Sequence, residues 1–240
     1  MNVLGHRGAS AYAPENTAPA FRKAIELGAD GVEFDVHLTA DGRAVVMHNF
    51  ELEKTSSGVG LISNYTLGEL KLLDVGKWYS REYEGTVILT LEEALEIVRD
   101  MRVINVEIKA PKPPYRNLPE IVGQTVKYMG LSHKVIVSSF SSQVALSAKK
   151  SNPKLKAALI YDRPVYFPTP VKYAEKVGAD ALHPADRMVT AQLALACTKA
   201  GIELNVWTVN NPARARMLQS WGVTGIFSDE PDTVRSMLRK

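Results

Sequence analysis

The chain has 240 residues, of which 45% are hydrophobic and 23% charged, so it is long enough to bury one large core. Its 29 Lys and Arg residues against 26 Asp and Glu residues leave a formal net charge of +3, too small to indicate a nucleic-acid partner. The lone cysteine, Cys197, excludes an internal disulfide framework and is expected to be a small buried thiol in a helix. The N-terminal sequence lacks the plan of a signal peptide, and no run of about 18 apolar residues occurs. We therefore expect a cytoplasmic protein without stable membrane insertion.

Short β-branched runs alternate with segments of helical periodicity along the chain, which is typical of βα units around a mainly parallel sheet. Strands are expected at residues 3–5, 31–37, 103–109, 134–138, 156–160, 180–182, 203–207 and 224–227. Helices are expected after them at residues 17–27, 91–100, 118–129, 142–150, 170–176, 191–200, 212–221 and 231–239. This repetition predicts a (β/α)8 TIM barrel that forms a single catalytic domain over residues 1–240.

A further strand-like run, residues 44–47, follows the pair Asp41-Gly42, which is a strong hairpin signal. It should therefore run antiparallel to the strand before it and cannot be one of the parallel strands of the barrel. This leaves residues 50–88 as a long connection, in which residues 67–73 suit a short helix. We expect a small insertion or lid after the second strand.

The boundaries of the helices carry their own signals. Asn16 is the expected N-cap of the first helix, and Gly28 is placed to end it. Pro170, Pro212 and Pro231 each fall near a helix start, where a missing backbone donor costs little.

Polar side chains interrupt two of the expected strands at every second position. The apolar set of residues 31–37 packs beneath the helices if the barrel is correct, which turns the alternate residues Glu33, Asp35 and His37 inward. Residues 103–109 repeat the pattern and turn Glu107 and Lys109 inward. Carboxylates from two strands are thus predicted to share one interior.

Three carboxylates in one interior repel each other, and burial disfavours their charged forms unless protons or a cation compensate. A divalent metal ion would do so, and all-oxygen ligands favour Mg2+ or Ca2+ over zinc. The alternative is a buried ionic network in which Glu33, Asp35 and Glu107 pair with Arg7 and Lys109.

Two histidines are expected at the rim where the active sites of barrel enzymes lie. His6 follows the first strand and His48 ends the hairpin arm, and imidazole suits proton transfer near neutral pH. A single histidine is usually structural, but two beside a metal site favour catalysis. Arg7 and Lys109 offer positive charge to a phosphate, with simple ion pairing to the carboxylates as the alternative.

The segments that carry these residues resemble the glycerophosphodiester phosphodiesterase family over nearly the whole chain. They read HRGASAYAPENT at 6–17, VEFDVHLTADGRAVVMHN at 32–49, TLEEAL at 90–95, NVEIK at 105–109, VWTVN at 206–210 and GIFSDEP at 225–231. The resemblance implies a barrel with an insertion after the second strand. It also implies that His6 and His48 are general acid and base, that Glu33, Asp35 and Glu107 bind the metal, and that Arg7 and Lys109 contact the phosphate.

The sequence departs from the family pattern at Asn49, where an acid usually follows the second histidine, and at Leu89, where a proline usually precedes TLEE. Asn49 is therefore expected to orient His48 and to alter its basicity.

His37 is expected at the rim, outside the metal ligands. Glu15 is expected to pair with Arg7 or a metal-bound water, or simply to charge a helix N-terminus. Phe140 and Trp207 are expected to wall the alcohol pocket, with core packing as the alternative.

The function implied by the resemblance is metal-dependent hydrolysis of a small glycerophosphodiester, such as glycerophosphocholine or glycerophosphoethanolamine, to an alcohol and glycerol 3-phosphate. The glycerol 2-hydroxyl is expected to attack first and give a cyclic phosphate that water then opens. Two alternatives use the same scaffold: a lysophospholipase D type of hydrolase, and a barrel that binds a phosphometabolite without catalysis.

Overall fold

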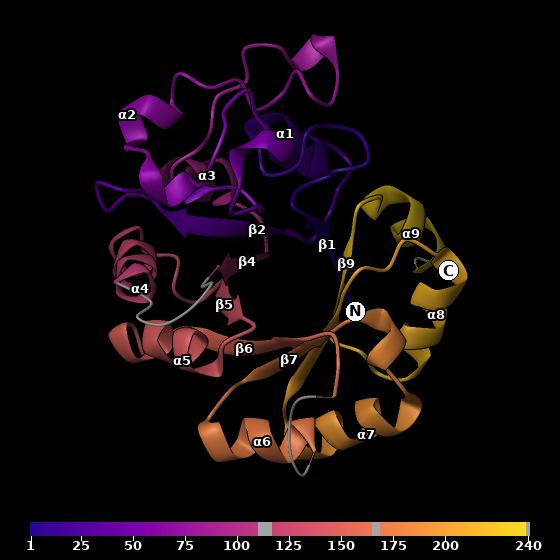
Figure 1. Cartoon of the computed structure of the whole chain (residues 1–240). Coiled ribbons are helices and arrows are strands. Elements are labelled where there is room, and N and C mark those ends of the chain that lie inside the picture. The colour runs from indigo at the N-terminus through magenta and orange to yellow at the C-terminus, as the bar shows by residue number, and fades with distance from the viewer. Residues whose placement is uncertain (110–116, 165–168, 239–240) are drawn as a thin grey trace.

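A computed structural model describes residues 1–109, 117–164 and 169–238 (Figure 1). Its parallel strands are β1 (Asn2–His6), β2 (Gly31–Leu38), β4 (Val103–Ile108), β5 (Val135–Ser139), β6 (Lys156–Tyr161), β7 (Ala181–Pro184), β8 (Glu203–Val206) and β9 (Gly225–Ser228). They follow one another around the sheet, and β1 pairs with both β2 and β9, so the sheet closes on itself. The predicted (β/α)8 TIM barrel is confirmed.

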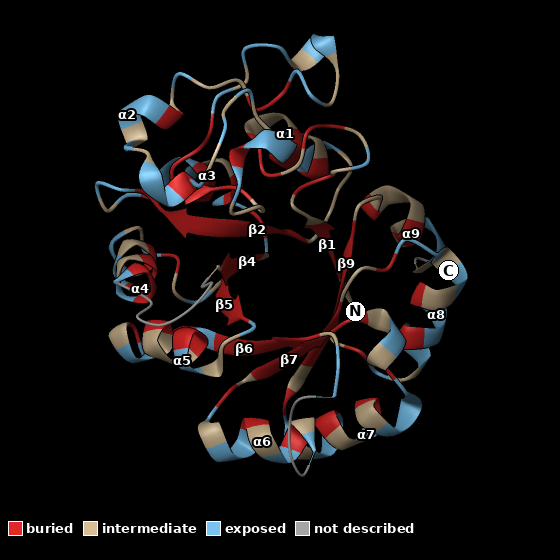
Figure 2. Ribbon diagram, viewed as in Figure 1, coloured by how far each residue is buried: buried red, intermediate tan, exposed pale blue. Residues whose placement is uncertain are grey.

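Helices surround this barrel and cover its outer face (Figure 1). They are α1 (Ala18–Glu26), α3 (Leu91–Val98), α4 (Leu118–Tyr128), α5 (Ser142–Ser151), α6 (Pro170–Val177), α7 (Ala191–Ala200), α8 (Pro212–Ser220) and α9 (Pro231–Leu238). Their buried residues face the strands and their exposed residues face outward (Figure 2). Each expected helix is present, although Arg239 of the last one lies outside the described residues. No helix in the described ranges is both long and apolar enough to cross a bilayer.

The alternation of β2 decides which side chains reach the barrel interior. Val32, Phe34 and Val36 are fully buried in one apolar cluster, to which α1 and α3 contribute Phe21 and Leu95. Because neighbouring side chains of a strand point to opposite faces, Glu33, Asp35 and His37 are turned inward, as predicted.

The connection after β2 begins with β3 (Ala44–Val46), which pairs antiparallel with β2 as the hairpin signal predicted. Gly42 adopts a φ of 78° in the turn between them, a conformation that glycine adopts without strain. The chain then forms the short helices η1 (Leu52–Lys54), η2 (Ile62–Asn64), α2 (Leu67–Leu70) and η3 (Arg81–Tyr83). This connection has an apolar cluster of its own around Leu52, Ile62 and Leu70.

Two tyrosine hydroxyls tie this connection to the loop after β1. The Tyr79 hydroxyl donates to the carbonyl of Ala11 at 2.7 Å, and the Tyr83 hydroxyl donates to the carbonyl of Tyr12 at 3.0 Å. The connection therefore packs against the loop that carries Arg7 and Glu15.

One helix boundary differs from the prediction. The N-cap of α1 is Thr17, whose hydroxyl accepts from the backbone N–H of Ala20, and not Asn16. Asn16 adopts a φ of 60°, in the left-handed region that asparagine tolerates, and its side chain turns into the barrel mouth. Gly28 does end α1, and Pro170, Pro212 and Pro231 open their helices as expected.

Candidate active site

The register of the strands sorts the polar interior residues into two levels. His6 on β1 lies opposite Glu33 on β2, and Glu33 lies opposite Asn105 on β4. One level nearer the strand ends, Asp35 lies opposite Glu107. His6 ends β1, and Asp35 and Glu107 lie in the carboxyl-terminal halves of β2 and β4, toward the end of a barrel where catalytic residues are found.

The three predicted metal ligands come together. One carboxylate oxygen each from Glu33, Asp35 and Glu107 lies within 4.8 Å of the others, and all three side chains are buried. Burial and the neighbouring carboxylates raise the pKa of Glu33 well above its usual range, and burial raises the pKa of Glu107 to about 7. Burial would also raise the pKa of Asp35, but Lys109 and Arg7 hold it well below its usual range.

Two cationic side chains contact this cluster. Lys109 Nζ lies 2.9 Å from Asp35 Oδ1 and 2.6 Å from Glu107 Oε1. The Arg7 guanidinium donates to both carboxylate oxygens of Glu15 at 3.0 Å, and its Nε lies 3.6 Å from Asp35 Oδ2. Glu15 therefore pairs with Arg7, one of its two expected roles.

The charges of this group do not balance. Four carboxylates, those of Glu15, Glu33, Asp35 and Glu107, face only Lys109 and Arg7 among the side chains described here. Fully ionised, the group carries a net charge of −2, which one divalent cation would neutralise. The oxygen-only donor set suits a hard ion, so the residues present fit a metal site. In the alternative, an ionic network, Arg7 and Lys109 would neutralise only two of the four negative charges.

Asn16 is a residue of this site that sequence reasoning missed. Its amide nitrogen donates to Asp35 Oδ2 at 2.8 Å, and its Oδ1 accepts from the backbone N–H of Asp35 at 3.2 Å. This reciprocal pair orients the Asp35 carboxylate. Asn16 stands in the segment PENT, directly before a run of helical periodicity, so the sequence predicted a helix N-cap at this position.

His6 has a carboxylate partner that was also missed. Its Nδ1 lies 2.7 Å from Oδ1 of Asp229, which also accepts from Ser10 Oγ at 3.0 Å, while Oδ2 accepts from Asn210 at 2.7 Å. Burial opposes the charged form, but these bonds, above all the one to His6, lower the pKa of Asp229 to about 2. An ionised carboxylate at Nδ1 places the proton there and leaves Nε2 available on the other side of the ring. The segment GIFSDEP held the signal, as an acid directly after a barrel strand.

His48 has a neutral partner instead. Its Nδ1 lies 3.3 Å from Oδ1 of Asn49, and burial lowers the pKa of His48 to about 4. His37 lies outside the carboxylate cluster, as expected. Its Nε2 contacts the carbonyl oxygen of His48 at 3.2 Å, and its ring packs edge-on against Phe50. His37 thus supports the backbone of His48.

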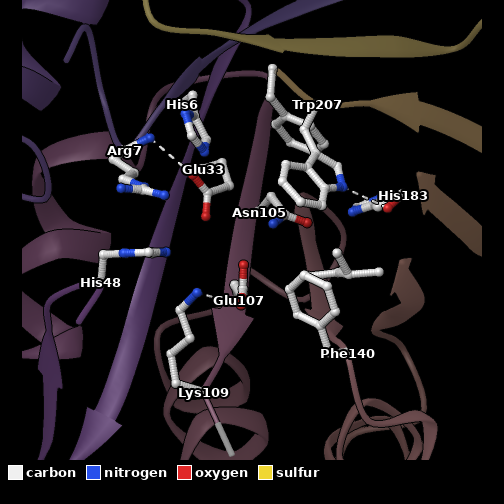
Figure 3. A pocket seen from close by; sticks show the side chains of 12 residues that line it. His6, Arg7, Glu33, His48, Asn105, Glu107, Lys109, Phe140, His183 and Trp207 are labelled. Carbon is white, nitrogen blue, oxygen red and sulfur yellow. Dashed lines mark hydrogen bonds and ion pairs between the residues drawn. The ribbon is translucent and has the colours of Figure 1, made fainter. Parts of the chain in front are cut away.

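The charged residues form one side of a pocket, and neutral residues form the other (Figure 3). Phe140 and Trp207 meet at a ring-centroid distance of 5.9 Å on the neutral side. Phe140 is 51% exposed, which excludes the core-packing alternative for it. Asn105 and His183 are buried members of this pocket that the sequence did not predict as site residues, although the strand alternation turns Asn105 inward. Burial alone lowers the pKa of His183 to about 3, and its Nε2 lies 3.0 Å from the amide nitrogen of Asn205.

Comparison with known proteins gives a consistent result. The model of the glycerophosphoryl diester phosphodiesterase family matches residues 6–233. A glycerophosphodiester phosphodiesterase of Caldanaerobacter subterraneus subsp. tengcongensis is 36% identical over 239 residues, which cover 99% of this chain and 98% of that one. The glycerophosphodiester phosphodiesterase of Bacillus altitudinis is 33% identical, with 96% and 95% covered.

Solved structures resemble the whole chain. A phosphodiesterase of Oleispira antarctica, in complex with its product sn-glycerol-3-phosphate, superposes with a TM-score of 0.88 at 29% identity and covers 100% of this chain and 97% of its own. A glycerophosphodiester phosphodiesterase of Thermotoga maritima superposes with a TM-score of 0.78 at 31% identity, with 100% and 98% covered.

Proposed function

Because the chain belongs to the glycerophosphoryl diester phosphodiesterase family, we propose that it hydrolyses glycerophosphodiesters to an alcohol and glycerol 3-phosphate. The observation that carries this proposal is the buried cluster of Glu33, Asp35 and Glu107, because Glu33 and Glu107 line the same pocket as His6 and His48. A pocket with acid ligands on one side and two imidazoles can bind a phosphodiester and move protons to and from it.

Glu33, Asp35 and Glu107 would hold one divalent ion, Mg2+ or Ca2+. When bound, such an ion neutralises charge on the phosphate and lowers the pKa of a hydroxyl beside it. Arg7 and Lys109 add positive charge at the same place, where they would contact the phosphate oxygens. Asn16 and Glu15 keep Asp35 and Arg7 in position through the hydrogen bonds described above.

The partners of the two histidines suit opposite roles. His48 is neutral and bonded to an amide, so it is suited to take the proton from the glycerol 2-hydroxyl as that oxygen attacks phosphorus. His6 is bonded to the ionised Asp229, which stabilises an imidazolium, so it is suited to protonate the departing alkoxide. Water then opens the cyclic phosphate with the two roles exchanged.

The neutral wall of the pocket is the proposed place of the alcohol groups. Phe140 and Trp207 present aromatic faces and edges opposite His6 and Arg7 (Figure 3). Flat apolar walls bury the carbon skeleton of glycerol or of the headgroup while the charged side binds the phosphate.

The same proposal treats residues 1–240 as one catalytic domain. The connection after β3 supports this, because Tyr79 and Tyr83 bond it to the loop that carries Arg7. The cytoplasmic location stays a prediction from the sequence.

An assay of the purified protein with glycerophosphocholine and either Mg2+ or Ca2+ tests the proposal. We expect choline and glycerol 3-phosphate in equal amounts, no turnover with a chelator, and a loss of roughly 10²-fold or more in His6→Ala and His48→Ala. Glycerol and phosphocholine as products would show that the other ester bond is cut. Faster release of choline from lysophosphatidylcholine than from glycerophosphocholine would favour the lysophospholipase D type of reaction. No turnover of either substrate would favour a barrel that binds a phosphometabolite without catalysis.

A further inference from the structure

A second cavity, of about 320 Å³, lies at the opposite end of the barrel. It is lined by residues at the amino ends of the strands, among them Asn2 of β1, Lys156 of β6 and Glu203 of β8. This end of a TIM barrel usually serves stability, so its side chains are expected to be apolar or mutually paired. In this cavity, however, several basic side chains have no carboxylate partner in the described part of the chain.

Basic side chains converge on it from three neighbouring strands. Arg102 precedes β4, His133 and Lys134 precede β5, and Lys156 begins β6. These strands are adjacent in the sheet, which brings their amino ends to one rim. Like charges on neighbouring strands are unfavourable unless an anion accompanies them.

The protein itself supplies little negative charge there. Glu203, the one carboxylate in the lining, lies 2.5 Å from Lys156 Nζ and is engaged by it. Lys134 Nζ donates to the carbonyl of Arg99. Within the described ranges, the Arg102 guanidinium and the His133 imidazole make no hydrogen bond or ion pair, so both are available to a ligand.

The inner wall of the cavity is polar, with Asn105 and Asn205 among its lining residues. Asn105 is 1% exposed, and its Oδ1 has no hydrogen-bond partner among the described residues, while its amide nitrogen donates to Ser138. Asn105 and Phe227 line both this cavity and the catalytic pocket, so they form the partition between the two. A wall that contains several side-chain amides favours a ligand that brings hydroxyl groups beside its charge.

We propose that this lower cavity is a binding site for a phosphate monoester of a small hydroxylated alcohol. The Arg102 guanidinium binds two phosphate oxygens at once, and the His133 imidazole donates one further hydrogen bond to the phosphate. The alcohol hydroxyl reaches toward the amide wall. The site is separate from the carboxylate cluster and does not depend on the diesterase reaction.

Local detection is needed because glycerol 3-phosphate is also expected to enter the catalytic pocket. The imidazole proton signals of His133, identified by their loss in His133→Gln, report on the lower cavity alone. We expect glycerol 3-phosphate to move these signals saturably, inorganic phosphate to move them with lower affinity, and glycerol to leave them unchanged. Arg102→Gln should weaken the apparent affinity roughly tenfold or more, as loss of a charged hydrogen bond implies.

The matched control is Arg81→Gln, an exposed arginine in the connection after β3. Arg102→Gln and Arg81→Gln should both keep the melting temperature and the diesterase rate of the wild type, because neither arginine belongs to the catalytic pocket. The proposal is overturned if only the signals of His6 and His48 respond to glycerol 3-phosphate, or if Arg102→Gln and Arg81→Gln bind it equally well. If the wild-type protein lacks diesterase activity but glycerol 3-phosphate still moves the His133 signals, the proposed function is contradicted and the lower binding site is supported.

Discussion

The imidazole Nδ1 of His6, at the end of β1, lies 2.7 Å from Oδ1 of Asp229, directly after β9. The two residues are 223 positions apart, and they meet because the pairing of β1 with β9 closes the barrel. The proton position on His6 therefore depends on complete closure of the sheet.

Asp229→Asn should lower kcat roughly 10²-fold to 10³-fold, since an amide neither stabilises the imidazolium of His6 nor fixes its Nδ1–H tautomer. Steady-state kinetics with glycerophosphocholine measure this. Asp232→Asn is the matched control, because Asp232 accepts a hydrogen bond from the Tyr12 hydroxyl away from His6. Equal kcat values in the two variants would contradict a positioning role for Asp229.

Asn49→Asp should move the acidic limb of the pH profile of kcat/KM to higher pH. The new carboxylate would stand 3.3 Å from Nδ1 of His48, favour its protonated form and raise its pKa from about 4. A base must be neutral, so activity at low pH is lost earlier. Asn49→Ala removes the bond without adding charge and should not produce this shift; the same upward shift in both variants would exclude the electrostatic cause.

Metal binding should stabilise the wild-type protein and leave Glu33→Gln nearly unaffected. A ligand at a hundred times its Kd adds about 2.7 kcal/mol to the free energy of unfolding. Without metal, Glu33→Gln should be at least as stable as the wild type, because it removes one of three mutually repelling buried carboxylates. Thermal unfolding with chelator and with Mg2+ or Ca2+ tests both statements. Exposed Glu92→Gln should behave as the wild type, and a full metal response in Glu33→Gln would remove Glu33 from the ligand set.

His183 should make the protein less stable as the pH falls. Burial lowers its pKa from 6.5 to about 3, so between these values the unfolded chain binds a proton that the folded chain excludes. The free energy of unfolding then decreases with falling pH, by at most about 1.4 kcal/mol per pH unit for this one proton. His183→Gln should make the dependence shallower, whereas exposed His133→Gln should not. Urea unfolding at several pH values gives the slopes, and identical slopes for wild type and His183→Gln would contradict the prediction.

Much of the site was predictable because strand geometry is local. Alternation in residues 31–37 and 103–109 was enough to turn Glu33, Asp35 and Glu107 inward, since successive side chains of any strand point to opposite faces. The hairpin at Asp41-Gly42 was equally local, and it placed His48 beside β2. Asn16 was misread because its residue type suits both a helix cap and a left-handed turn, and only the position of Asp35 selects the turn.

The sequence by itself determined the repeating βα units, the inward face of each polar strand and the residue types available for chemistry, because these follow from backbone geometry over a few residues. Only the tertiary structure decided that Asp229 supports His6, that Asn16 holds Asp35, and that Arg102 and His133 share a cavity. Those contacts join distant segments, and their distances depend on how the closed sheet brings the ends of different strands together.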